Sequence, residues 1–135
     1  MYASILVPLA PDHGAVRDSA MAIARALLRP GGRITVLTVL ETIPAYVAQY
    51  LPADQAERNR AEMAATLAAE FEGQADVTTA VAYGHPAQTI LDVAAEGGHD
   101  CIVIASHKPG MQDYFLGSTA ARGVRHARCG VHVLR

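Results

Sequence analysis

Gly117 and Ser118, near the end of the chain, have the residue types and placement of an anion-binding site. They follow an apolar, β-branched run at 102–104 and a polar, turn-rich segment at 106–110, and an alanine-rich helical pattern comes next. Ser118 is a favourable N-cap residue, and Gly117 lets a backbone or an anion approach the helix start. A strand, a loop and a capped helix start present free N–H groups and the positive end of a dipole to a phosphate.

The same residues also suit an ordinary connection between a strand and a helix, in which Ser118 does nothing but cap the helix. Caps are common and anion sites are fewer, so both interpretations remain open on these residues alone.

Other chemical motifs are missing from the sequence. It contains no Gly-x-Gly-x-x-Gly, no Gly-x-x-x-x-Gly-Lys-Ser/Thr, no Gly-x-Ser-x-Gly and no acidic pair after the first expected strand. His126 and Cys129 have a metal-like spacing, but one such pair does not make a metal site. With no positioned general base or carboxylate pair to activate water, we predict no catalytic residue and no metal ligand.

The elements that must position Gly117 and Ser118 alternate between strands and helices. Short apolar or β-branched runs predict strands at 4–9, 33–40, 76–83, 101–105 and 130–135. Helical spacing predicts four helices. The first begins at residue 16 and is stopped by residues 30–32, and the second spans 54–72. The third runs from 86 to the glycines at 97–98, the fourth spans 118–127, and 41–52 is irregular. This alternation predicts an α/β fold with a doubly wound parallel sheet. Ligands of such sheets lie at the carboxyl ends of the strands, where the strand order reverses. Segments 8–10 and 105–117 would face that crevice if the first and fourth strands are neighbours.

Length, charge and cysteine usage restrict the class of protein. The 135 residues suit one domain, 1–135, and a net charge of −2 gives no basic face for nucleic acid. No apolar run has membrane-spanning length, and the first residues lack the features of a signal peptide, so we expect a cytoplasmic protein without membrane contact. Cys101 should be a buried thiol and Cys129 a partly exposed one, with no disulfide between them.

Several segments, taken together and in order, resemble the universal stress protein family, the UspA-like domains. They are 5–8 (Ile-Leu-Val-Pro), 36–39 (Val-Leu-Thr-Val), 84–90 (Gly-His-Pro-x-x-x-Ile), 100–107 (Asp-Cys-Ile-Val-Ile-Ala-Ser-His), 116–118 (Leu-Gly-Ser) and 125–131 (Arg-His-Ala-Arg-Cys-Gly-Val). The likeness covers essentially the whole chain. It implies a five-stranded parallel sheet in the order 3-2-1-4-5, with helices on both faces, similar to the adenine nucleotide alpha hydrolase fold.

The resemblance also implies a nucleotide loop, but this chain departs from the family's Gly-x-x-Gly-x9-Gly-Ser/Thr pattern. Ala105 stands at the first glycine, Lys108 and Pro109 occupy the region of the second, and the loop is one residue shorter. The family's aspartate after the first strand is replaced by Ala10, with Asp12 close by. This shortened form is similar to the subgroup that contains UspF and UspG, whose members are associated with nucleotide binding.

From this resemblance we expect a site for ATP or AMP, with or without Mg²⁺. Backbone groups of Val39 and of the Pro8–Leu9 turn would line the adenine slot. Ribose and phosphates would be flanked by Ile104, Ala105 and His107, and the N–H groups of Gly117, Ser118 and Thr119 would hold a phosphate.

Three functions remain open at this point. The first is a cytosolic stress-response module that binds an adenine nucleotide, the second is a scaffold of the same fold that binds none, and the third is a slow ATP hydrolase. The family further implies a homodimer in which the last strand, 130–135, pairs antiparallel with its copy. Val131 and Val133 would then lie at the interface.

Overall fold

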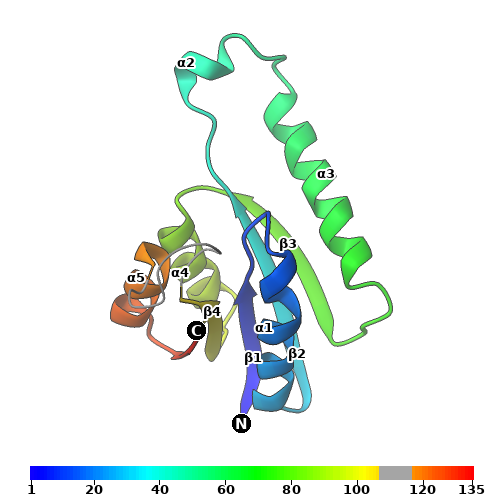
Figure 1. Ribbon diagram of the computed structural model, residues 1–135, viewed down its shortest axis with the longest axis vertical. Coiled ribbons are helices and arrows are strands. Elements are labelled where there is room, and N and C mark those ends of the chain that lie inside the picture. Colours follow the sequence, from blue (N-terminus) through cyan, green and yellow to red (C-terminus); the bar gives the residue numbers. More distant parts are fainter. Residues whose placement is uncertain (107–116) are drawn as a thin grey trace.

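The computed structural model describes residues 1–106 and 117–135, and within them five strands form one parallel sheet. The strands are β1 (Tyr2–Pro8), β2 (Leu28–Leu40), β3 (Val77–Tyr83), β4 (Cys101–Ala105) and β5 (Gly130–Leu134). Their order across the sheet is β3-β2-β1-β4-β5, and every neighbouring pair is parallel (Figure 1). The predicted order 3-2-1-4-5 is therefore confirmed.

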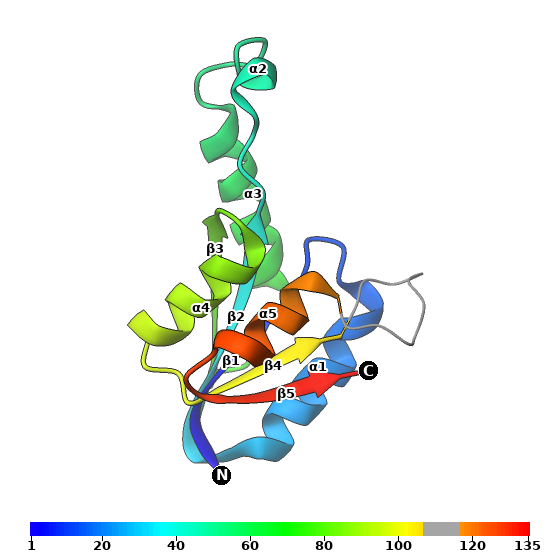
Figure 2. The same cartoon turned by 90° about the vertical axis from the view of Figure 1, so that its left-hand side faces the viewer.

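Helices cover both faces of this sheet. Helices α1 (Gly14–Leu27) and α3 (Gln55–Glu70) pack on one face, and α4 (Pro86–Glu96) and α5 (Ser118–His126) pack on the other (Figure 1). A short helix, α2 (Ala45–Ala48), lies in the segment expected to be irregular, at the far end of an arm that extends away from the sheet (Figure 2). In the part of the chain that the structure describes, no helix is long and apolar enough to cross a membrane.

The central strand β1 shows why the sheet must be covered on both sides. Ile5 and Val7 belong to the core beneath α1 and α3, whereas Leu6 belongs to the core beneath α4 and α5. Successive side chains of a strand point to opposite faces, and all three of these side chains are fully buried. A strand that is apolar at every position can be satisfied only inside a sheet with helices on each face. The helices match this arrangement, because Ala24 of α1 and Leu67 of α3 are fully buried in the first core and Ile90 of α4 is buried in the second.

The second strand begins earlier than the sequence predicts. Pro30, Gly31 and Gly32 were expected to end the preceding helix and to precede a strand at residue 33, but α1 ends at Leu27 and β2 begins at Leu28. Leu28 pairs with Tyr2, and the register then shifts before Ser4 pairs with Arg33. Gly31 has a positive φ of 79°, which a glycine adopts at little cost, so the extra residues form an irregularity within an extended segment.

Candidate functional site

A cavity of about 480 Å³ opens at the carboxyl ends of β1, β2 and β4. The chain builds β1, β2 and β3 outward in one direction and then returns to place β4 and β5 on the other side of β1. The cavity therefore lies where the strand order reverses, which is where open α/β sheets bind ligands. Its walls come from the β1–α1 loop, the end of β2, the first turn of α4, the end of β4 and the first turn of α5. The lining residues are Pro8, Leu9, Ala10, Pro11, Asp12, Leu37, Val39, Leu40, Glu41, Pro86, Ile90, Ile104, Ala105 and Thr119.

The structure brings most of the predicted nucleotide-site residues to this cavity. Those that line it are Pro8, Leu9, Val39, Ile104, Ala105 and Thr119. Gly117 and Ser118 are not lining residues, but they directly precede Thr119 at the start of α5. His107 and Lys108 lie outside the described residues.

Local backbone pairing fixes the floor of the cavity. The N–H of Leu9 donates to the carbonyl oxygen of Leu37 at 2.8 Å, so the pairing of β1 with β2 continues past Pro8. Leu9 is 3% exposed, and Ile104 on the other side of the reversal point is 5% exposed. Rigid strand ends thus hold apolar side chains around the cavity, a surface suited to a flat apolar ring.

The start of α5 differs from the prediction in one respect. Gly117, not Ser118, is the N-cap: its carbonyl oxygen accepts the first helical hydrogen bond, from Ala121 N–H at 2.9 Å, and no side chain caps the helix. Gly117 takes the extended conformation of an N-cap residue, with φ −62° and ψ 157°, and its N–H donates to the carbonyl oxygen of Ser106. The bond between Gly117 and Ser106 fixes the start of α5 at Gly117, one residue before the expected N-cap. The Gly117 N–H is therefore already engaged, and the helix start offers the N–H groups of Ser118 and Thr119, which have no acceptor within the helix.

Sequence reasoning left out the two carboxylates of the cavity. Asp12 was noted only as close to the missing aspartate, and Glu41 was not considered, yet both line the cavity. Glu41 directly follows β2, so the rule that ligands meet the carboxyl ends of strands was the signal available for it. Ionised carboxylates accept hydrogen bonds, so this pair suits the hydroxyl or amino groups of a ligand. Within residues 1–106 and 117–135, no three His, Cys, Asp or Glu side chains are grouped to hold a metal ion.

A second and larger groove, of about 600 Å³, runs between α4 and α5 and includes His99, His126 and Cys129. These residues precede β4 or β5 or end α5, so the groove lies toward the amino ends of these strands and contains none of the predicted site residues. We favour the smaller cavity as the functional site because it lies at the reversal point of the sheet. Both cysteines are free, and burial raises the pKa of the Cys101 thiol to about 11, as expected for a filler of the core.

Comparison with known proteins agrees with this fold. The sequence profile of the Universal stress protein family matches residues 1–135, and the chain belongs to this family. Universal stress protein G of Shigella flexneri is 27% identical over 142 residues, which span the whole of both chains.

Solved structures of the same family share the fold. The universal stress protein UspA from Lactobacillus plantarum has a TM-score of 0.65 and 25% identity, covering 99% of this chain and 98% of its own. A universal stress protein in complex with cAMP has a TM-score of 0.61 and 19% identity, with coverage of 99% and 97%. A family member from Arabidopsis thaliana with AMP bound has a TM-score of 0.61 and 16% identity, with coverage of 96% and 90%.

Proposed function

We propose that this protein is a stress-response module that binds an adenine nucleotide, AMP or ATP, in the cavity at the carboxyl ends of β1, β2 and β4. The observation that carries the proposal is the convergence of Pro8, Leu9, Val39, Ile104, Ala105 and Thr119 on one cavity of about 480 Å³. These residues come from the ends of separate strands, from the β1–α1 loop and from the first turn of α5. Two structures of the same fold with cAMP and AMP bound support the choice of ligand class.

The residues present fit such a ligand. The adenine ring would lie against Leu9, Val39 and the Pro8–Leu9 backbone, while Ile104 and Ala105 would flank the ribose and phosphates. The N–H groups of Ser118 and Thr119, at the positive end of the α5 dipole, would hold a phosphate. Mg²⁺, which keeps several waters and binds through few carboxylates, would enter with the phosphates of ATP.

Two positions favour the alternative of a scaffold that binds no nucleotide. Ala10 and Ala105 both line the cavity. Ala10 stands in place of the family's aspartate after the first strand, and Ala105 stands in place of the first glycine of its nucleotide loop. An alanine at either position provides neither a carboxylate for the ligand nor the close approach that glycine allows.

Calorimetric titration with AMP, ATP and adenosine separates these functions. We expect wild type to bind AMP and ATP, and Gly117→Val to weaken both because a β-branched side chain crowds the phosphate position. Adenosine, which has no phosphate, should bind Gly117→Val and wild type equally. Gly123→Ala is the matched control, because it lies in the same helix and, among the described residues, a methyl group there meets no atom within 4 Å beyond its own helical neighbours. Absence of AMP and ATP binding to wild type at millimolar concentration would establish the scaffold function instead.

We further propose a cytoplasmic homodimer that forms through β5. Within the described residues β5 pairs only with β4, so its other edge presents unpaired backbone groups. Val131 and Val133 already pack partly against the core beneath α4 and α5, and an antiparallel copy would cover what remains of them.

A further inference from the structure

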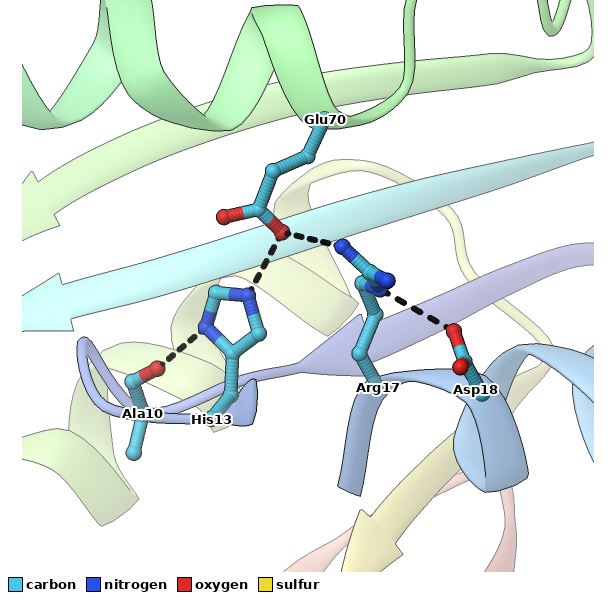
Figure 3. Close-up of polar contacts among 5 residues, drawn as sticks. All are labelled: Ala10, His13, Arg17, Asp18 and Glu70. Carbon is cyan, nitrogen blue, oxygen red and sulfur yellow. Dashed lines mark hydrogen bonds and ion pairs between the residues drawn. The ribbon is translucent and has the colours of Figure 1, made fainter. Parts of the chain in front are cut away.

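A buried histidine joins the loop of the cavity to the end of α3 (Figure 3). His13 is 6% exposed, and its two ring nitrogens face two different acceptors. The Nδ1 atom lies 2.6 Å from the carbonyl oxygen of Ala10, and Nε2 lies 2.7 Å from Oε2 of Glu70. His13 thus connects the β1–α1 loop with the last residue of α3, 57 positions further along the chain.

Both contacts are hydrogen bonds only if the imidazole carries two protons. A neutral imidazole has one N–H, so its other nitrogen would direct a lone pair at an acceptor. Here that acceptor would be either the Ala10 carbonyl or the Glu70 carboxylate, at a distance where two acceptors repel each other. A doubly protonated ring would donate to both partners, whereas a neutral ring can donate to one of them.

The charges around His13 suit the two helix ends that meet here. His13 is the N-cap of α1, where a positive charge alone is unfavourable, and Glu70 ends α3, where a negative charge alone is unfavourable. A positive charge is favourable at the C-terminus of α3, and a negative charge is favourable at the N-terminus of α1. The contact between His13 and Glu70 therefore offsets both unfavourable interactions. From α1, Arg17 also approaches Oε2 of Glu70 at 3.4 Å while its Nε pairs with Asp18. Asp12, on the same loop, is the remaining charged neighbour in sequence.

The carboxylate of Glu70 responds to these neighbours. Burial raises the pKa of Glu70, but the hydrogen bonds and positive charges of His13 and Arg17 outweigh burial and leave it below its ordinary value. The lowered pKa keeps the Glu70 carboxylate ionised and able to accept a hydrogen bond from Nε2 of His13.

The bridge ends on the wall of the cavity. Ala10, whose carbonyl oxygen His13 holds, lines the cavity together with Pro11 and Asp12. These three residues form a loop between the last residue of β1 and the first turn of α1, with no strand partner of their own in the described pairing. Their position therefore depends on the hydrogen bond to His13 at one end and on β1 at the other.

We propose that the bridge between His13 and Glu70 is a positioning device, which holds the Ala10–Asp12 wall in the conformation that accepts the ligand. Its effect on affinity rests on the proposed nucleotide site, whereas its effect on the loop does not. His13 and Glu70 touch no ligand in this scheme and act only through the backbone of Ala10.

The first measurement uses the ligand-free protein. Backbone amide NMR relaxation of Ala10 and Asp12 is compared among wild type, His13→Gln and Glu70→Gln. We expect larger-amplitude motion of both amides in both variants. Glu70→Gln keeps the shape of the side chain, so it remains informative if His13→Gln fails to fold. Asp76→Asn is the matched control. It breaks the contact of 2.6 Å between Asp76 and Arg25 of α1, the helix that begins after His13, and neither residue lines the cavity, so both amides should be unchanged.

The second measurement is the affinity for AMP at neutral pH. We expect the dissociation constant to rise about tenfold in Glu70→Gln, the worth of one charged hydrogen bond, and to stay at the wild-type value in Asp76→Asn. An equal rise in both variants would assign the effect to general destabilisation and would overturn the positioning role.

The outcomes keep the two proposals apart. If wild type binds no AMP, the proposed function fails, while amide relaxation still decides whether the bridge holds the loop. If wild type binds AMP but both variants show wild-type relaxation and wild-type affinity, the site stands and the positioning device is wrong.

Discussion

The backbone N–H of Gly117 donates to the carbonyl oxygen of Ser106, so the end of β4 and the start of α5 are joined directly. The same glycine accepts the first hydrogen bond of α5 through its own carbonyl. Gly117 is thereby a fixed N-cap, and the capping of α5 does not depend on the hydroxyl of Ser118. The effect of Ser118 on helix stability can therefore be measured separately from its effect on anion binding.

Ser118→Ala should therefore weaken ligand binding without a comparable loss of stability. We propose that the hydroxyl of Ser118 donates to the phosphate beside the N–H groups of Ser118 and Thr119, so its loss should cost about 1 kcal/mol in AMP affinity, the typical worth of one hydrogen bond. The free energy of unfolding should change by less than about 0.5 kcal/mol, because alanine is the better helix former and no side-chain cap is removed. Calorimetry and urea denaturation measure the two quantities. A stability loss above about 1 kcal/mol would show that the hydroxyl caps the helix after all.

Thr38→Val should stabilise the protein. Thr38 is fully buried in β2, and among the described residues its hydroxyl oxygen has no hydrogen-bond partner. Valine has nearly the same shape and removes an unsatisfied polar group, so we expect a gain of about 1 kcal/mol in the free energy of unfolding. Thr78→Val is the control, because Thr78 is exposed and bonds to Arg33. Equal effects of the two substitutions, or a loss with Thr38→Val, would contradict the prediction.

Asp100 should make stability depend on pH in the acidic range. Its carboxylate accepts hydrogen bonds from the N–H groups of Ala3 and Ser4, each at 3.0 Å, and ties the start of β1 to the start of β4. The bond from Ala3, followed by that from Ser4, holds the pKa of Asp100 below its ordinary value against the opposing effect of burial. A lowered pKa in the folded state gives stability that is fully present above the unfolded-state pKa and is lost as the pH falls through the folded-state pKa.

Asp100→Asn tests this contribution. We expect a loss of about 1 kcal/mol at neutral pH, discounted for the partial exposure of the carboxylate, and a smaller loss relative to wild type as the pH is lowered. Urea denaturation at several pH values measures both. A difference between variant and wild type that does not shrink in acid would assign the effect to packing and not to charge.

Val133→Pro should break the proposed dimer. Gly130 N–H and the Leu134 carbonyl bond toward β4, and alternate residues of a strand point their backbone groups to opposite sides, so Val133 faces the free edge of β5. Proline there removes an edge donor while the pairing with β4 remains. Val133→Ala keeps the donor and removes only the packing of the side chain, so it controls for lost burial. Sedimentation at micromolar concentration should show a dimer for wild type and Val133→Ala and a monomer for Val133→Pro; a monomeric wild type would end the proposal.

The alternation of strands and helices could be read from local apolar patterns, whereas the strand order came from the family likeness. In β1, Ile5, Leu6 and Val7 are consecutive and apolar, which requires a strand covered on both faces. The start of β2 could not be read in this way. Pro30 and Gly31 are turn residues by local preference, and only the pairing of Leu28 with Tyr2 makes the segment extended.

The residues of the candidate site also fall into those that the sequence predicted and those that only the tertiary structure brought together. The sequence by itself determined the alternation of strands and helices and the residues at the strand ends, such as Pro8, Val39 and Ile104, because these follow from local apolar patterns and from the family likeness. The tertiary structure alone decided that Gly117 caps α5, that Asp12 and Glu41 share the cavity, and that His13 reaches Glu70. Each of these depends on backbone groups or charges that lie far apart in the chain and are brought within hydrogen-bond distance, or into one cavity, only when both faces of the sheet are packed.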